Sequence, residues 1–568
     1  MNKKTILTAA VMAACLQTNA QTLGTDFKGS NNANPISASV FCADPTAIDY
    51  MGRLYVYGSN DHQQFKANNK KGDNGYGAIK SLVVFSTDDM VNWTFHGTID
   101  VGKVCTWAGQ SWAPSAVWRT TSAGKDEFFI YFANGGGSVG VMKSKTSSPL
   151  GPFSSPLSGA MITGSTPGVS PCNWVFDPGV VIDSTGTAWI GFGGGDPNNQ
   201  GNDLQPNNAR FAKLKPSMVG IDGKAVKIPA PYHFEASELN IMDGKFVYTY
   251  CSSWRGRNNW SQYQKEQNIS VSAPGSCTMC YMVSDNPMDP NSWKYKGDFG
   301  PHPGTSPNNH SHLHKFQGNY YHIYHSGALL QGMKNANAVD GSASGYRSIC
   351  VNKATVNETT QKISKVTLNN TGVTAVKNLN PYELQQAETM ATCGGIAYED
   401  FSNITKNTSV SSLGNDASRE LQVKMAAGSW TQLRKVDFGT EGAVSFTLRA
   451  KGKGTMEIRL GTKTAQPAAT IEFSSTVFEE QTFELDPSLF TGVKTVYFVC
   501  TAVNGNFYWD NWKFSDTLPD AVAAPTVSTS KAPDATFRLD GSVVNGNTQP
   551  RGLIIERKAG QSRKRIVK

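Results

Sequence analysis

The chain has 568 residues, of which only 17% are charged, and its formal net charge is +8. This length is enough for two or three domains with sizeable cores, and few charges beside many glycines and aromatic residues favour a β-rich exported protein over a helical one. The basic residues crowd the last eighteen positions, where only Glu556 opposes them, so the rest of the chain is close to neutral. We therefore expect no nucleic-acid partner, and we interpret the tail as a solvated or interaction segment.

The N-terminus has the pattern of a secretory signal peptide. Two lysines precede an apolar run over residues 6–16, and Ala20 ends a small-residue cleavage site. The run is too short to span a membrane, and no other segment is expected to cross one. The pattern predicts a bacterial protein that is secreted, either extracellular or at the cell surface, with lipid attachment at Cys15 as the alternative.

One phrase recurs five times between about residues 35 and 375: a turn with glycine or aspartate, then alternating aromatic and aliphatic residues. Copies roughly 60 to 75 residues apart leave room for one four-stranded sheet each. The pattern predicts a five-bladed β-propeller rather than a β-sandwich, with unrelated hairpins as the alternative. The copies are GRLYVYGS (52–59), KDEFFIYFAN (125–134), GTAWIGFGG (186–194), GKFVYTYCS (244–252) and GNYYHIYHS (318–326).

Three carboxylates stand about ten residues ahead of a repeat, each in an apolar strand: Asp44, Asp177 and Glu235. Equivalent strands of a propeller begin at its axis, so we expect these side chains to converge on one central pocket. Glycoside hydrolysis needs one protonated and one ionised carboxyl group across the scissile bond, and a third carboxylate nearby raises the pKa of the acid. A calcium site is the competing interpretation.

Aromatic residues near these carboxylates favour a sugar over an ion as the ligand. The side chains of Trp107, Trp112, Trp174 and Phe176 offer flat apolar faces on which pyranose or furanose rings can stack.

The segment from about 34 to 380 resembles glycoside hydrolase family 43, and within it the bacterial arabinoxylan arabinofuranohydrolases. The motifs that carry the resemblance stand in the family's order: ADPTAIDYMGRLYVYGS, STDDMVNW, SWAPSAVW, FANGGGSVGV, STPGVSPCNWVFDPGVVID, FEASELNIMDGKFVYTY, NNHSHLHKFQGNYYHIYHS and GYRSICVNK. The resemblance implies a secreted, inverting, non-reducing-end α-L-arabinofuranosidase that removes arabinose side chains from arabinoxylan. Asp44 is then the general base and Glu235 the general acid, about 6.5–9.5 Å apart, and Asp177 orients Glu235 and keeps its pKa high.

The same resemblance implies residues that bind sugar and an ion. Trp112 and Arg347 match residues that line the sugar pocket, where Phe176 offers a further ring. His310 matches a histidine near the propeller axis that helps to hold calcium or another ion through waters. Glu238 matches no catalytic position and is interpreted as structural.

Two other functions remain open. The same fold serves β-xylosidases and arabinan hydrolases, and motif likeness separates these activities weakly. A non-catalytic sugar-binding propeller belongs to a different class, and the presence of all three carboxylates argues against it.

The strand-rich segment after the propeller resembles carbohydrate-binding module family 6. Gln386, Glu388 and Asp510 match the structural calcium ligands of that family, and they are the oxygen donors that calcium prefers. Trp430 matches an aromatic platform in its sugar cleft. Tyr508 stands where the family usually has an asparagine, so a module that merely packs on the propeller is the alternative.

The predicted fold class is all-β, a five-bladed β-propeller followed by a β-sandwich (jelly-roll) module. We expect a monomer that needs no cofactor for its chemistry, with structural calcium in the module and at the propeller axis. The expected segments are a signal peptide (1–20), the catalytic propeller (31–380), the carbohydrate-binding module (381–516), a linker (517–534) and the basic tail (535–568).

The cysteines leave their pairing open. Ten are present, and nine remain if cleavage follows Ala20, so at least one thiol is unpaired or paired between chains. Cys277 and Cys280 have CxxC spacing, which in an exported protein indicates a local disulfide or buried thiols rather than a zinc site.

Overall fold

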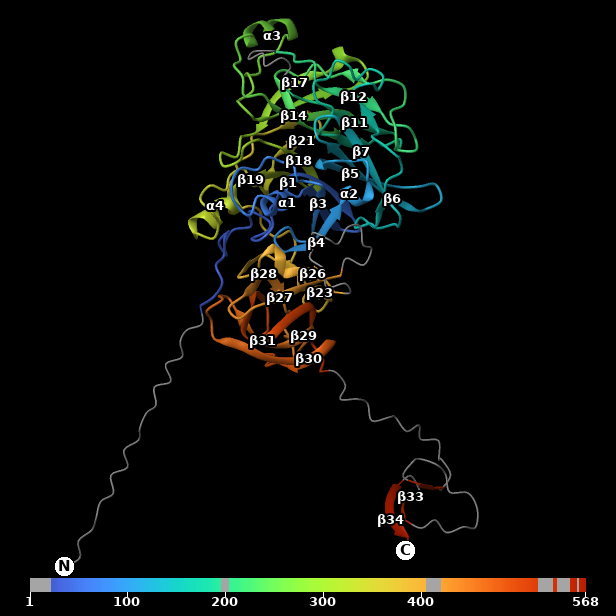
Figure 1. Cartoon of the computed structure of the whole chain (residues 1–568), viewed down its shortest axis with the longest axis vertical. Coiled ribbons are helices and arrows are strands. Elements are labelled where there is room, and N and C mark those ends of the chain that lie inside the picture. Colours follow the sequence, from blue (N-terminus) through green and yellow to red (C-terminus); the bar gives the residue numbers. More distant parts are fainter. Residues whose placement is uncertain are drawn as a thin grey trace, which may run out of the picture. The chain divides into compact units, whose positions relative to one another are not determined.

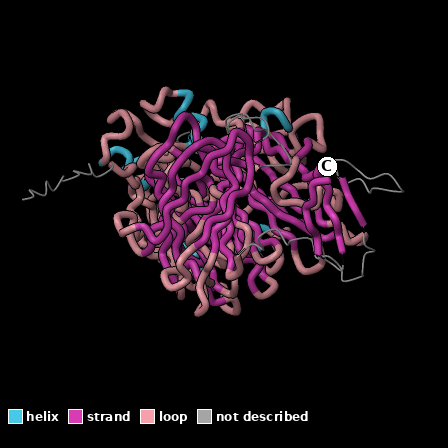
Figure 2. Tube along the Cα trace, turned by 90° about the horizontal axis from the view of Figure 1, so that it is seen from below, coloured by secondary structure: helices cyan, strands magenta, loops and turns pink. Residues whose placement is uncertain are grey.

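The computed structural model describes residues 22–195, 204–404 and 420–518, together with three short strands of the C-terminal segment. Strands are the main regular structure of these residues, and the few helices are short and lie in connections (Figure 2). Two compact units are present, the first ending at Asp516 and the second beginning at Thr517. The predicted signal peptide and most of the predicted linker lie outside the described residues.

Five antiparallel sheets form the propeller, which is coloured from blue to yellow in Figure 1. The first strand of each sheet contacts the first strands of the two neighbouring sheets, so these five strands are innermost. The first four blades have four main strands and the fifth has three. The strands of the first two blades are β1 (Ala43–Tyr50), β2 (Arg53–Ser59), β3 (Ser81–Thr87), β4 (Trp93–Asp100), then β5 (Trp112–Thr120), β6 (Asp126–Asn134), β7 (Ser138–Ser144), β8 (Phe153–Ser154) and β9 (Ile162–Thr163). The third and fourth blades contain β10 (Gly179–Ile182), β11 (Ala188–Phe192), β12 (Arg210–Lys213), β13 (Val226–Lys227), then β14 (His233–Met242), β15 (Lys245–Ser252), β16 (Met279–Ser284) and β17 (Lys294–Gly300). The fifth contains β18 (Ser311–Phe316), β19 (Asn319–Ser326) and β20 (Ser348–Ala354), followed by the hairpin β21 (Val356–Asn357) and β22 (Lys362–Ile363).

The repeated phrases correspond to the second strand of every blade, and the prediction of a five-bladed propeller is confirmed. Alternation of aromatic and aliphatic residues suits these strands because both faces are covered by neighbouring blades. In β2 and β6, for example, Val56, Tyr57, Phe129 and Ile130 are all fully buried.

The propeller is closed by residues near its N-terminus. The backbone N–H of Ile36 donates to Ile349 of β20, and that of Cys42 donates to Arg347. The Asn34 side chain donates to the carbonyl of Val351 and accepts from its N–H. The last blade therefore pairs with chain that precedes the first blade, which fixes the five innermost strands around one axis.

The module is a curled antiparallel sheet, as the predicted sandwich requires. Its order is β25-β28-β31-β27-β26, with β23 and the long strands β29 and β30 attached through β31. The strands are β23 (Gln385–Gln386), β24 (Thr389–Met390), β25 (Thr392–Gly394), β26 (Phe401–Asn403), β27 (Leu421–Met425), β28 (Trp430–Asp437), β29 (Ser445–Leu460), β30 (Pro467–Glu484) and β31 (Val493–Ser515).

Propeller and module share one hydrophobic core. Strand β24 leaves the module and pairs with β4 of the first blade, so that Met390 lies opposite Trp93. The same buried cluster contains Val56 and Trp93 of the propeller and Trp512 of the module. The two parts are thus packed together as one unit.

The helices and the C-terminal unit complete the described chain. Among the described residues, no helix combines the length and apolar character that a membrane crossing requires. The helices are α1 (Asp61–Ala67), α2 (Val101–Val104), α3 (Trp260–Gln267) and α4 (Ala328–Asn335), with single turns at Pro290–Ser292 and Tyr398–Asp400. The tail contains a small antiparallel sheet of β32 (Ala535–Arg538), β33 (Gly552–Lys558) and β34 (Gln561–Val567).

Candidate active site

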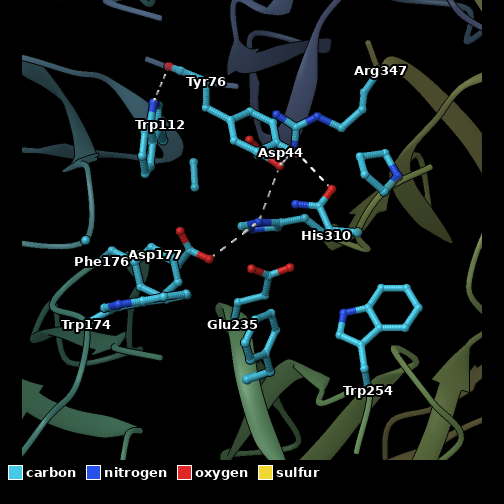
Figure 3. Close-up of a pocket in the computed structure, with 15 residues that line it drawn as sticks. Asp44, Tyr76, Trp112, Trp174, Phe176, Asp177, Glu235, Trp254, His310 and Arg347 are labelled. Carbon is cyan, nitrogen blue, oxygen red and sulfur yellow. Dashed lines mark hydrogen bonds and ion pairs between the residues drawn. The ribbon is translucent and has the colours of Figure 1, made fainter. Parts of the chain in front are cut away.

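A pocket of about 530 Å³ opens where the innermost strands of the propeller begin. The three carboxylates come from three different blades and point into this one space, as Figure 3 shows. Eight residues singled out from the sequence line the pocket: Asp44, Trp112, Trp174, Phe176, Asp177, Glu235, His310 and Arg347.

Asp44 is held as an ionised carboxylate. Its Oδ1 accepts from Arg347 Nη1 at 2.7 Å, and its Oδ2 accepts from the hydroxyl of Ser59 at 2.7 Å. Burial is the largest single effect and would raise the pKa of Asp44, but the positive charge of Arg347 and the contact with His325 together outweigh burial and hold that pKa well below its usual range. Arg347 is itself fixed by two bonds of 2.9 Å to the buried carboxylate of Asp61.

Glu235 and Asp177 are held in the opposite state. Burial, followed by the charge of Asp177, raises the pKa of Glu235 well above its ordinary value. Burial also raises the pKa of Asp177 to about 8, although its Oδ2 accepts the backbone N–H of Ala236 at 2.8 Å. Oε1 of Glu235 is buried and has no hydrogen-bond partner among the described residues, so a protonated Glu235 is free to donate to a ligand.

The pocket therefore combines one ionised carboxylate with a protonated one. Two carboxyl groups whose environments push their pKa values apart are what general acid and base catalysis at one bond requires. The contrast comes from Arg347, which contacts Asp44 directly and has no such contact with Glu235 among the described residues.

His310 lies beside two of the carboxylates. Its Nδ1 is 3.7 Å from Asp44 Oδ1 and 3.9 Å from Asp177 Oδ2. Burial lowers the pKa of His310 to about 4, so the ring is neutral at neutral pH. Among the described residues no cluster of three or more His, Cys, Asp or Glu side chains has metal-binding geometry. An ion held by His310 therefore stays a prediction, and no step proposed below passes through one.

Aromatic side chains form the pocket walls. Trp112 donates its indole N–H to the carbonyl of Tyr76 at 3.2 Å, and Trp174 packs edge-on against Phe176 with ring centroids 5.2 Å apart. Trp254 also lines the pocket, from the loop after β15, and sequence reasoning missed it because that loop lies outside the repeats. Trp107 does not line this pocket; it stacks on Phe132 in the core between the first and second blades.

The structure contradicts the expectation that Trp430 is a sugar platform. Its side chain is 0% exposed and packs with Leu23 and Tyr497. Its indole N–H donates to the carbonyl of Gly24 at 2.8 Å, and the ammonium of Lys463 lies 4.4 Å from the ring centroid. The chain's own N-terminal residues occupy the face that a sugar would need.

The predicted calcium ligands of the module lie close together. Burial, opposed by a backbone hydrogen bond and reinforced by the charge of Asp510, raises the pKa of Glu388 well above its ordinary value. Glu388 Oε1 is buried without a hydrogen-bond partner among the described residues. Gln386 pairs with Asn511, the neighbour of Asp510, and Arg449 donates to the carboxylate of Asp510. An orphaned buried carboxylate beside a second one fits a calcium ion, which would compete with Arg449 for Asp510.

Comparison with known proteins agrees with this architecture. The model of glycosyl hydrolases family 43 matches residues 32–357, and that of carbohydrate binding module family 6 matches residues 386–516. Fold and pocket together define a carbohydrate-active hydrolase, and the chain belongs to glycoside hydrolase family 43.

Two relatives and one solved structure are similar to this protein over most of the chain. An arabinoxylan arabinofuranohydrolase of Bacillus subtilis (strain 168) is 35% identical over 87% of this chain and 95% of its own. One of Paenibacillus polymyxa is 34% identical over 85% of this chain and 74% of its own. The crystal structure of a family 43 arabinoxylan arabinofuranohydrolase from Bacillus subtilis in complex with cellotetraose superposes with a TM-score of 0.74, at 33% identity, over 87% of this chain and 99% of that one.

Proposed function

We propose that this glycoside hydrolase is an α-L-arabinofuranosidase that removes arabinose side chains from arabinoxylan with inversion of configuration. The observation that carries the proposal is the contrast in ionisation between Asp44 and Glu235 within one pocket. The choice of arabinoxylan is supported by the names of the two relatives that are 34% and 35% identical to this chain over the aligned residues.

Asp44 is the general base of this proposal. Its carboxylate accepts a proton from water as the water attacks the anomeric carbon on the face opposite the leaving group. Arg347 and Ser59, one on each carboxylate oxygen, fix the direction of the carboxylate. Because Arg347 keeps Asp44 ionised, the base is ready over the whole neutral and mildly acidic range.

Glu235 is the general acid. Its carboxyl O–H donates a proton to the glycosidic oxygen as the bond to arabinose breaks, and the xylan chain leaves as an alcohol. Asp177 sits behind it, anchored on the N–H of Ala236, the residue after Glu235. This bond orients the strand that carries the acid, and the charge of Asp177 raises the pKa of Glu235. After each turnover Glu235 regains a proton from solvent and Asp44 releases one.

Two tryptophans at the pocket are placed to bind the main chain of the polymer. Trp174 is 37% exposed and Trp254 is 48% exposed, and they come from different blades on either side of Glu235 (Figure 3). Exposed indole faces stack on sugar rings. We assign them to xylose units that flank the branched one, while the arabinose enters the pocket between them.

The decisive experiment compares the sugars released from wheat arabinoxylan, xylo-oligosaccharides and linear arabinan, with Asp44→Ala as the inactive control. Arabinose alone, from arabinoxylan and not in the control, is the expected result. Release of xylose or of arabino-oligosaccharides would mean that the enzyme acts by the same mechanism on a different substrate. The first-formed anomer, followed by NMR, tests inversion: β-L-arabinose is expected, and the α-anomer would contradict a single displacement.

The role of Glu235 can be tested by leaving-group chemistry. Glu235→Ala should lower turnover on arabinoxylan by a factor on the order of 10² or more, because no group protonates the departing alcohol. The aryloxide of an activated aryl arabinofuranoside is a good leaving group that departs without protonation. The hydrolysis of that substrate should therefore fall much less. Steady-state kinetics on both substrates checks this, and equal losses would remove Glu235 from the role of acid.

We also propose that the chain is exported through the signal peptide at 1–20 and acts as a monomer. N-terminal sequencing of the exported protein should begin at Gln21, whereas a lipid-modified Cys15 would show membrane anchoring instead. Sedimentation of the exported protein tests the oligomeric state.

A further inference from the structure

Two cysteines meet directly behind the catalytic carboxyl group. The sulfurs of Cys251 and Cys277 are 3.5 Å apart, and both side chains are fully buried. Cys251 is the last residue but one of β15 and lies opposite Glu235 in the pairing of β14 with β15. Cys277 precedes β16 and is close enough to Glu235 to contribute to raising the pKa of that carboxyl group.

The chain between these cysteines is a closed loop that carries part of the pocket. It contains helix α3 and Trp254, which lines the pocket beside Glu235. Hydrogen bonds already hold its two ends side by side: Ser252 N–H donates to Thr278 O at 2.9 Å, and Ser252 Oγ donates to Gly275 O at 2.7 Å.

Arg257 adds a second brace inside the same loop. Its Nη2 donates to Ser253 O and to Gly275 O, both at 2.8 Å, and its Nε donates to Pro274 O at 3.0 Å. Both ends of the loop are thereby fixed, and the two thiols at its base remain in contact.

We propose that Cys251 and Cys277 form a disulfide when the folding chain meets a thiol oxidant, and that this bond closes the base of the loop that carries Trp254. A disulfide has its sulfurs about 2.05 Å apart, so the pair must approach by about 1.5 Å, a movement that rotation of the two side chains can supply. Cys280, which has CxxC spacing from Cys277, is not its partner. The thiol of Cys280 donates a hydrogen bond to the carbonyl of Thr278 instead.

The oxidation balances as a thiol–disulfide exchange. The thiolate of Cys277 attacks the disulfide of an exported thiol oxidoreductase and releases one of its sulfurs as a thiolate. The thiolate of Cys251 then attacks the Cys277 sulfur, forms the new S–S bond and releases the second sulfur of the oxidant. The pair loses two electrons and two protons, and the oxidant becomes a dithiol. Burial raises the pKa of Cys251 well above its ordinary value, so the exchange belongs to the folding stage, before the thiols are enclosed.

Such a bond would constrain the unfolded chain and keep the pocket wall in place. The expected signature is a link in the protein folded under oxidising conditions and a lower melting temperature after its reduction. Trp254 would then move more freely, so the KM for arabinoxylan oligosaccharides should rise on reduction while that for a small aryl arabinofuranoside changes less.

The test uses the full chain refolded in a buffer of reduced and oxidised glutathione. The protein is denatured in iodoacetamide without reduction, digested and analysed by mass spectrometry. The expected product is one peptide pair linked through Cys251 and Cys277, with Cys280 alkylated. Both cysteines found alkylated would overturn the proposal, as would a link from Cys277 to Cys280.

Variants separate the bond from the mere loss of a thiol. In the Cys251→Ser/Cys277→Ser protein, dithiothreitol should leave Tm unchanged, whereas in the parent chain it should lower Tm by on the order of 5 °C. Cys280→Ser is the matched control, since it removes a buried thiol from the same region and should keep both the linked peptide and the response to reductant. If dithiothreitol still lowered Tm in the double variant, the assignment of the disulfide to Cys251 and Cys277 would be wrong. If the double variant does not fold, the peptide mapping of the parent chain decides the question.

Discussion

Asp44 and Asp177 share an unusual backbone conformation in two different blades. Their φ angles are 48° and 46°, and Ala113 and Ala236 adopt the same region in two further blades. In β1, β5 and β14 this residue lies within a register shift of the innermost pair of strands. Non-glycine residues at positive φ cost on the order of 1–3 kcal/mol and persist where the fold imposes them, often at active sites. One recurring bulge therefore turns the strand starts toward the axis, and the sequence placed carboxylates on only some of them.

The electrostatic role of Asp177 should be visible in the pH dependence of activity. The basic limb of the activity profile reports loss of the proton of Glu235, whose pKa the charge of Asp177 raises. Asp177 carries that charge once it ionises, above its own pKa of about 8. Asp177→Asn removes the charge, so Glu235 should lose its proton more easily and the basic limb should move to lower pH by on the order of one unit. A pH profile of kcat/KM measures the shift, and the acidic limb, which belongs to Asp44, should stay in place. A basic limb that stays unchanged or moves upward would contradict the electrostatic role of Asp177.

Among the elements, residues 22–32 form an N-terminal strap that ties the module to the propeller. The N–H of Gly24 donates to the carbonyl of Gly428, and the carbonyl of Gly24 accepts the indole N–H of Trp430. The ammonium of Lys28 donates to Ala391 O at 2.8 Å. A Cβ on Gly24 would lie 2.3 Å from the backbone N of Gly395, so only glycine permits this close approach. The strap then continues into the segment that closes the fifth blade. It makes the Trp430 face a structural contact rather than a binding surface.

Substitution of Trp430 and of Trp254 should have opposite effects on stability and on binding, which tests the structural role of the strap. Trp430→Ala should lower the free energy of unfolding by about 3–5 kcal/mol, because a buried indole is removed, and should leave binding to insoluble arabinoxylan unchanged. Trp254→Ala is the matched control: its exposed ring contributes little to stability, and its loss should weaken binding. Denaturant unfolding and pull-down on arabinoxylan measure both properties, and Trp430→Phe serves if the alanine variant does not fold. If Trp430→Ala weakened binding without loss of stability, Trp430 would be a sugar-binding residue after all.

Across the whole first unit, the module is an extension of the propeller core. Strand β24 lies on the edge of the first blade, and the carbonyl of Glu388 accepts the N–H of Phe95 in β4. Glu388 and Asp510, the predicted calcium ligands, therefore stand at the junction of the two parts. A change in charge there should affect the stability of the unit as a whole.

Removal of calcium tests this junction. Binding of calcium to the folded state alone stabilises it, so EDTA should lower the melting temperature and added calcium should restore it. Glu388→Gln should abolish the response, because a neutral amide replaces the buried carboxylate. Calorimetry of the full chain measures the shift. An unchanged melting temperature in EDTA would mean that Arg449, which donates to Asp510, supplies the compensating charge.

The sequence by itself determined the propeller, the blade count and the three carboxylates, because period-two alternation and spacing are local properties of the chain. It also located Trp112, Phe176, Arg347 and His310, which line the pocket through motifs beside the same strands. Only the tertiary structure decided that Arg347 joins Asp44 to Asp61, that Trp254 enters the pocket and that Cys277 meets Cys251 rather than Cys280. It likewise decided the fate of Trp430, whose partners Leu23 and Gly24 lie some four hundred residues away. These contacts join residues that are distant in the chain, and burial and charge depend on such neighbours, which no local pattern specifies.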